Sequence, residues 1–110
     1  MSLSSNEIAN LSRISTLKMI HASKAAHLGS SLSVIDILSV LFGKVAKVLP
    51  SDPDSLASDQ VLVSKGHAAA GTYAVLSHSG FFSPSLLDDY CKDGAALGGH
   101  VTYGKVPGIA

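Results

Sequence analysis

Residues 64–69, Ser-Lys-Gly-His-Ala-Ala, bring together several side chains that could do chemistry. They supply a hydroxyl, an ammonium and the imidazole of His67, and Gly66 lets a ligand approach the backbone closely. The block follows an apolar run at 61–63 and precedes a helix-like segment, and helix N-termini attract anions. The sequence therefore predicts a phosphate or diphosphate bound near Ser64, Gly66 and His67. A structural turn with a solvated lysine is the alternative.

Three of the five histidines lie beside glycines at predicted turns: His27, His67 and His100. Together they could line one cleft, where imidazole suits recognition of sugar hydroxyls and proton transfer near neutral pH. Their separations of 40 and 33 residues match no local metal-binding signature, so no metal ligand is predicted. His21 and His78 fall inside predicted helices, where a packing or surface role is expected.

Two helices are expected ahead of this block. Ser4 and Glu7 have the spacing of a capping box, and apolar residues recur every three positions from Ile8 to Ile20, which predicts a helix to about residue 26. Residues 27–33 form a polar break with glycine.

The second helix is predicted from Val34 to about Val48, because Ser33 and Asp36 can cap it and Pro50 stops it. Residues 51–58 are expected to form a surface loop.

The second half of the chain carries the only good strand candidate, Asp59–Ser64. A third helix is predicted from Ala69 to about Ser79, with Gly80 as a left-handed cap, and a fourth from Ser83 to about Lys92. The glycine-rich tail from residue 93 is expected to be loop.

One strand cannot make a sheet, and a strand this apolar belongs inside a parallel sheet covered on both faces. The partner strands are not in this sequence. The prediction is therefore an α/β fold, of which this chain forms a front portion that is itself mostly helical.

The composition favours a folded domain, with 46% hydrophobic and 15% charged residues. Eight basic and eight acidic residues cancel, and no basic stripe suggests nucleic acid or an anionic membrane surface. The mean hydropathy of +0.35 is high for so short a chain, which suggests that something outside these residues covers part of the apolar surface.

Cys91 is the only cysteine, so no internal disulfide forms, and a buried structural thiol is expected. The N-terminus lacks the pattern of a secretory signal. The most apolar window, Leu32–Phe42, is too short and too polar to be expected to span a bilayer. A cytoplasmic location follows as the expectation.

Three blocks, in this order and spacing, resemble the N-terminal part of transketolase. They are residues 26–33 (Ala-His-Leu-Gly-Ser-Ser-Leu-Ser), residues 61–70 around Ser-Lys-Gly-His-Ala-Ala, and Gly99-His100 followed by Val-Pro-Gly-Ile at 106–109. The resemblance covers nearly the whole chain. It implies that residues 1–110 are the front portion of a thiamine-diphosphate-binding, parallel-sheet domain with helices on both faces. The family moves a two-carbon ketol unit between sugar phosphates.

The resemblance also implies roles for the candidate residues. His67, with Gly66 and Ser64, would bind the cofactor at its diphosphate. His27 and His100 would be the catalytic histidines that face the donor sugar's hydroxyls and the cofactor's reactive carbon. The ligands of the accompanying Mg²⁺ are expected outside this chain.

The chain departs from many single-chain transketolases at Leu28 and Val101, where they have proline after the histidine. This pattern is closer to the split members, whose N- and C-terminal sections are separate polypeptides. The Gly-Asp-Gly…Asn motif that holds magnesium and diphosphate does not occur by Ala110, nor does the activating glutamate of the other domain. Activity is therefore expected only with a C-terminal section or the remaining chain, in a homo- or hetero-oligomer.

Two other interpretations stay open. One is a related thiamine-diphosphate enzyme, such as a deoxyxylulose-phosphate or dihydroxyacetone synthase. The other is a non-catalytic fragment that binds a partner, although three intact histidines favour an enzyme.

Overall fold

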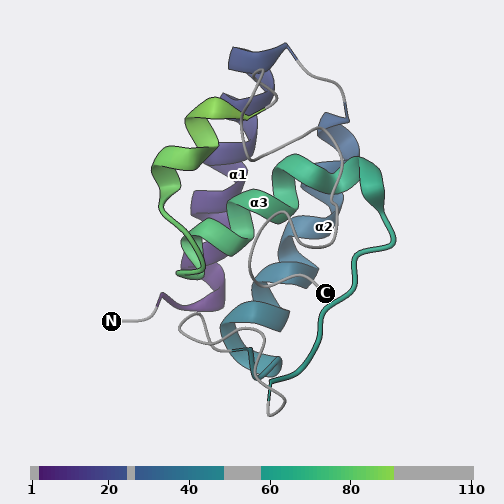
Figure 1. Ribbon diagram of the computed structural model, residues 1–110, viewed down its shortest axis with the longest axis vertical. Coiled ribbons are helices and arrows are strands. Elements are labelled where there is room, and N and C mark those ends of the chain that lie inside the picture. Colours follow the sequence, from purple (N-terminus) through teal and green to yellow (C-terminus); the bar gives the residue numbers. More distant parts are fainter. Residues whose placement is uncertain (1–2, 25–26, 49–57, 91–110) are drawn as a thin grey trace.

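The computed structural model describes residues 3–24, 27–48 and 58–90, and the regular elements in these ranges are all helical (Figure 1). The two longest, α1 (Ser5–Ser23) and α2 (Leu28–Val40), lie side by side, and α3 (Ala69–His78) crosses both. Three short turns complete the set: the π-helical η1 (Leu41–Val45) and the 3₁₀ turns η2 (Gly66–Ala68) and η3 (Pro84–Asp89).

The predicted capping box begins α1. The Ser4 hydroxyl accepts a hydrogen bond from the Glu7 amide, and the Glu7 carboxylate accepts one from the Ser4 amide, each at 3.2 Å. The helix ends slightly before the predicted residue 26, because Lys24 turns into the left-handed region with φ 54°.

The apolar stripe of α1 does not form one buried face. Residues three apart advance by about 300° around a helix, so a strict period of three winds around it. Ile8 is buried, whereas Leu11, Ile14 and Leu17 are 39%, 52% and 50% exposed. The buried side instead combines small or polar residues, Ala9, Ser12 and Thr16, with the apolar Ile8 and Met19.

The prediction for the start of the second helix is wrong, because α2 begins at Leu28 rather than Val34. Ser33 and Asp36 are therefore not caps but lie inside the helix, and His27 takes the cap position. Serines and a glycine make 27–33 a poor helix by propensity. Burial of Ser31, Ile35 and Leu38 in the angle between α1 and α3 overrides that preference. The helical course ends at Val45, three residues before the predicted end.

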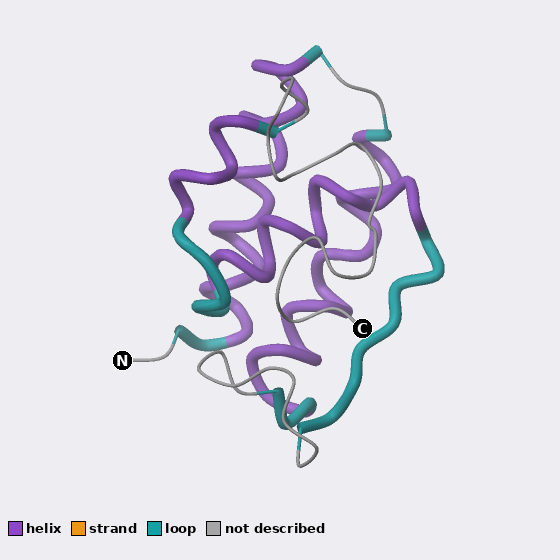
Figure 2. Tube along the Cα trace, in the orientation of Figure 1, coloured by secondary structure: helices purple, strands orange, loops and turns teal. Residues whose placement is uncertain are grey.

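The predicted strand Asp59–Ser64 is also not found: the described residues contain no strand, as Figure 2 shows. A strand needs a neighbour to complete its ladder of hydrogen bonds, and the segment has none among them. The chain nevertheless keeps the alternation of a strand, since Val61 and Val63 pack on the core while Leu62 is 74% exposed.

The third helix forms as predicted and is almost wholly internal. Every residue of α3 from Ala69 to Ser77 is buried, and Gly80 follows it with φ 94°. The predicted fourth helix is only the 3₁₀ turn η3, which Ser83 caps by accepting from the Ser85 amide at 3.3 Å. Its predicted continuation to Lys92 lies outside the described residues.

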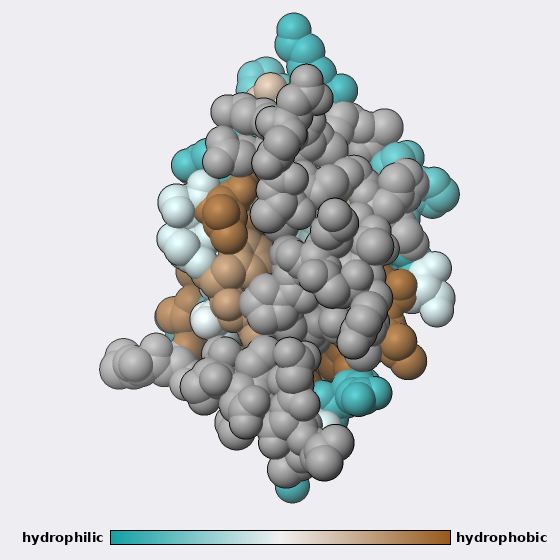
Figure 3. Space-filling model, viewed as in Figure 1, coloured by the Kyte–Doolittle hydropathy of each residue, from teal (hydrophilic) through white to brown (hydrophobic). Residues whose placement is uncertain are grey.

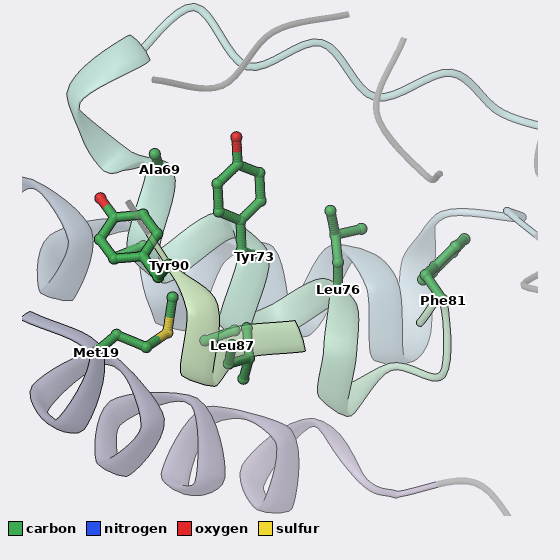
Figure 4. Close-up of a cluster of buried hydrophobic side chains, with 9 residues drawn as sticks. Met19, Ala69, Tyr73, Leu76, Phe81, Leu87 and Tyr90 are labelled. Carbon is green, nitrogen blue, oxygen red and sulfur yellow. The ribbon is translucent and has the colours of Figure 1, made fainter. Parts of the chain in front are cut away.

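The larger of the two apolar clusters among the described residues joins α1, α3 and η3 (Figure 4). The Tyr73 and Tyr90 rings meet edge to face with centroids 6.3 Å apart. Aromatic pairs in this arrangement contribute roughly 0.5–1.5 kcal/mol beyond the burial of their surface. The buried members are Met19, Ala69, Ala70, Tyr73, Ala74, Leu76, Phe81, Leu87 and Tyr90.

Apolar side chains also reach the surface, as the brown areas of Figure 3 show. Ile37 and Val45, on the helical course that follows His27, are 61% and 60% exposed. That course, Leu28–Val45, is long and apolar enough by length and composition to cross a membrane, with a mean hydropathy of 1.6. The sequence expectation concerned the shorter window Leu32–Phe42, which lies inside this course. Core helices of soluble proteins meet the same criterion, and Ile35 and Leu38 are buried in the core here.

Candidate functional site

The structure brings together two of the three histidines that the sequence singled out. The rings of His27 and His67, 40 positions apart in the chain, have centroids 4.4 Å apart and planes inclined by 60°. Both residues are exposed to solvent. Two imidazoles at this distance present a set of hydrogen-bonding groups that one ligand could engage together.

His27 owes its place to the start of α2. Its backbone adopts a left-handed conformation with φ 74°, and its carbonyl accepts the first hydrogen bond of the helix, from Ser31 at 3.1 Å. The ring makes no capping bond to the helix. A non-glycine residue in this conformation is uncommon and is often found at functional sites.

His67 lies in η2, the tight turn that leads into α3. The turn is closed by a bond of 3.0 Å from the Ala68 amide to the Lys65 carbonyl. It is brought to α2 because α3 packs on α2 without a side chain between them at Gly71. A Cβ at Gly71 would lie 2.6 Å from the Ser31 carbonyl oxygen.

A second link joins the two segments at the surface. The Lys65 ammonium donates to the Ser33 hydroxyl at 2.5 Å, and that hydroxyl donates to the Ser30 carbonyl at 3.1 Å. Sequence reasoning missed this link, since nothing in the local pattern relates positions 33 and 65.

The exposed helix N-terminus beside His67 belongs to α2, whereas the first residues of α3, Ala69 and Ala70, are buried. The first amides of a helix have no partner within it and favour anions. Gly29, in the first turn of α2, faces open space: a Cβ there would meet no described atom within 4 Å. The first amides of α2 and the two imidazoles are hydrogen-bond donors at an exposed part of the chain, and groups of this kind bind phosphate.

The other candidates are placed only in part. Ser64 is exposed in the extended segment before η2, and Gly66 begins that turn, so both adjoin His67. His100 and Cys91 lie outside the described residues. Within the described ranges, no group of three or more His, Cys, Asp or Glu side chains could hold a metal ion.

His78 lies apart from this pair, and its role is in packing. Its Nε2 is 2.8 Å from the Ser15 hydroxyl of α1, and burial lowers the pKa of the His78 imidazole below its ordinary value of 6.5. A separate cavity of about 400 Å³ lies between α1 and η3, with Lys18, Met19 and Leu87 among its lining residues. It shares no residue with the histidine pair.

Comparisons with known proteins identify a family that matches nearly the whole chain. The family model described as "Transketolase, thiamine diphosphate binding domain" matches residues 4–110. Among similar proteins, an apulose-4-phosphate transketolase subunit from Phocaeicola vulgatus is 33% identical over 84% of this chain and 33% of its own length. A 6-deoxy-6-sulfo-D-fructose transketolase subunit from Clostridium is 34% identical over 92% of this chain and 37% of its own length.

A solved transketolase structure has a similar fold. The transketolase from Leishmania mexicana superimposes with a TM-score of 0.86 at 27% identity, over 99% of this chain and 16% of that one. The chain thus spans about a third of the length of the subunit relatives and a smaller share of the long transketolases. The fold is that of the N-terminal part of a thiamine-diphosphate domain.

Proposed function

This chain belongs to the transketolase family, in its thiamine diphosphate binding domain, and from that premise we propose that it supplies one part of a ketol-transfer site. The observation that carries the proposal is the contact of the His27 and His67 rings at 4.4 Å. Residues 1–110 would form the front portion of the diphosphate-binding domain.

His67 is the residue that we assign to the diphosphate. It is exposed, adjoins Gly66 and Ser64, and lies beside the first turn of α2. An imidazole N–H donates to a phosphate oxygen, and hydrogen bonds to charged acceptors contribute roughly 1.5–3 kcal/mol. When bound, thiamine diphosphate would supply the carbanion chemistry of ketol transfer, and the residues of this chain would bind and orient it. The accompanying Mg²⁺ would take its ligands from outside the described residues.

His27 is the residue that we assign to the substrate side, together with His100. His27 has a left-handed backbone conformation, and its ring contacts that of His67. From that position its imidazole would hold a sugar hydroxyl and accept or return its proton, work that typically contributes about a hundredfold or more in rate.

The rest of the site would come from a C-terminal section or the remaining chain, in a homo- or hetero-oligomer. Relatives that are named as transketolase subunits support this arrangement, since the chain matches about a third of their length. The substrates proposed are sugar phosphates, and the compartment proposed is the cytoplasm.

The test uses alanine variants of the assembled enzyme. His67→Ala should lower the affinity for thiamine diphosphate about ten- to a hundred-and-fifty-fold. A thiamine analogue without phosphates should bind the variant and the wild type with equal affinity. His27→Ala and His100→Ala should lower turnover at saturating cofactor more than they weaken cofactor binding. Titration calorimetry and a ketol-transfer assay give the two quantities.

His21→Ala is the control, because His21 is an exposed histidine on α1 that is not among the candidate site residues. It should change neither affinity nor turnover. Equal losses for the analogue and the cofactor in His67→Ala would contradict the diphosphate role. An assembled wild type that binds cofactor but transfers no ketol unit would favour the non-catalytic interpretation.

A further inference from the structure

Lys65 carries a contact that its sequence position does not explain. It is an exposed lysine at a turn, where a solvated side chain is the ordinary outcome. Its ammonium instead donates to the Ser33 hydroxyl at 2.5 Å, across 32 positions of the chain. The Ser33 hydroxyl gives its own proton to the Ser30 carbonyl, at 3.1 Å, so its lone pairs remain available to Lys65.

Each of the two residues in this hydrogen bond is close in the chain to one of the two histidines. Ser33 lies in α2, the helix that His27 begins, and Lys65 precedes His67 by two residues. The contact of the His27 and His67 rings completes a closed loop of structure. Gly66 is the residue between Lys65 and His67, and glycine has wider backbone freedom than any other residue.

Because Gly66 is flexible, the Lys65–Ser33 hydrogen bond can restrict the movement of His67. A glycine directly before His67 would let the imidazole swing relative to α2 if nothing fixed the chain ahead of it. The packing of Gly71 against Ser31 fixes the chain after His67. The Lys65–Ser33 bond fixes it before His67, so the histidine is held from both sides.

We propose that Lys65 is a positioning residue, which holds His67 against His27 through its hydrogen bond to Ser33. The inference rests on the proposed function, in which these two histidines share one site. The bond has a charged donor, which strengthens it, but both of its side chains are exposed, which weakens it. We therefore expect an effect of about three- to tenfold on cofactor affinity, the range of a solvent-accessible polar contact.

The experiment is a double-mutant cycle in the assembled enzyme with Lys65→Met, Ser33→Ala and the double variant. Lys44→Met is the matched control, because Lys44 is an exposed lysine in η1. Two quantities are measured: the affinity for thiamine diphosphate, and the nuclear Overhauser signal between isotope-labelled His27 and His67 rings without cofactor. The ring signal reports position directly and needs no catalysis.

Each single variant should lose the ring signal and should bind the cofactor more weakly, by the same factor. The double variant should bind it no more weakly than either single variant. Ser33→Thr, which keeps the hydroxyl, should restore both quantities, and Lys44→Met should change neither. A global loss of stability would lower the melting temperature of the variants, so thermal unfolding is followed in parallel.

Two results would overturn the positioning role. One is an unchanged ring signal in Lys65→Met. The other is a larger loss of affinity in Lys65→Met than in Ser33→Ala with additive effects in the double variant, which would mean that Lys65 binds the anion itself. If the wild type fails to bind thiamine diphosphate, the proposed function is wrong, while the ring signal still decides the role of Lys65.

Discussion

Gly71 of α3 lies directly against the backbone of Ser31 in α2, so closely that a Cβ at Gly71 would be 2.6 Å from the Ser31 carbonyl oxygen. This contact sets how near α3 approaches α2. The turn that carries His67 leads directly into α3, and His27 begins α2. The packing of two backbones therefore determines the distance between two candidate site residues.

Gly71→Ala should consequently damage both stability and the site. The added methyl group overlaps backbone, which cannot rotate away, so α3 must shift, at a cost of about 1–3 kcal/mol. Thermal unfolding should show the loss, and cofactor affinity should fall with it because His67 moves relative to His27. Unchanged stability in the variant would mean that the helices are not packed this closely.

Gly29→Ala should raise the stability of the fold, whereas Gly71→Ala lowers it. A Cβ at Gly29 meets no described atom within 4 Å, and alanine is a better helix former than glycine by up to about 1 kcal/mol. The variant should therefore unfold at a slightly higher temperature. If the open space is where the ligand approaches, affinity for thiamine diphosphate should fall. A gain in stability with unchanged affinity would place the ligand elsewhere.

The stability of the fold should depend on pH through His78. Burial lowers the pKa of its imidazole below the ordinary 6.5, so the folded chain binds fewer protons than the unfolded chain in that range. The contribution of neutral His78 is complete above pH 6.5 and is lost as the pH falls through the lower folded pKa. Chemical denaturation between about pH 8 and pH 5 should show this decline.

His78→Gln should remove that part of the pH dependence, because glutamine does not titrate yet keeps a polar group near Ser15. His21→Gln provides the comparison, since His21 is exposed. If the free energy of unfolding of His78→Gln varied with pH as steeply as that of the wild type, the pH dependence would belong to other groups.

Ser4→Ala should destabilise α1 without changing the site. It removes the hydroxyl that accepts from the Glu7 amide, and loss of such a cap costs about 0.5–2 kcal/mol. The capping box lies at the end of α1 opposite the α1–α2 connection. The melting temperature should fall, whereas the fraction of protein that remains folded should bind cofactor with wild-type affinity. Weaker binding by that fraction would link the start of α1 to the site.

The chain on its own should self-associate and show no ketol transfer. Ile14 and Ile37, on α1 and α2, are 52% and 61% exposed, and apolar surface of this kind favours association in water. Sedimentation should detect oligomers that Ile14→Lys and Ile37→Lys reduce. Asn10→Lys adds the same charge at an exposed polar position of α1 and should have a smaller effect. An active monomer would contradict this prediction.

Local patterns in the sequence were sufficient for several features. Ser4 and Glu7 predicted the start of α1, and Gly80 predicted the end of α3, because both depend on groups within a few residues of each other. The Ser-Lys-Gly-His-Ala-Ala block identified His67 as a candidate for the same reason. The family, too, was correctly inferred from three short blocks.

Other features depended on contacts between distant parts of the chain. The first turn of α2 has weak helix formers, and its burial against α1 and α3 decided that residues 28–33 are helical. The apolar run 61–63 has the composition of a strand, but a strand exists only with a hydrogen-bonded neighbour. The pairing of His27 with His67 depended on the absence of a side chain at Gly71 and on the bond from Lys65 to Ser33. The sequence thus determined which groups are present, and packing in three dimensions decided which of them meet.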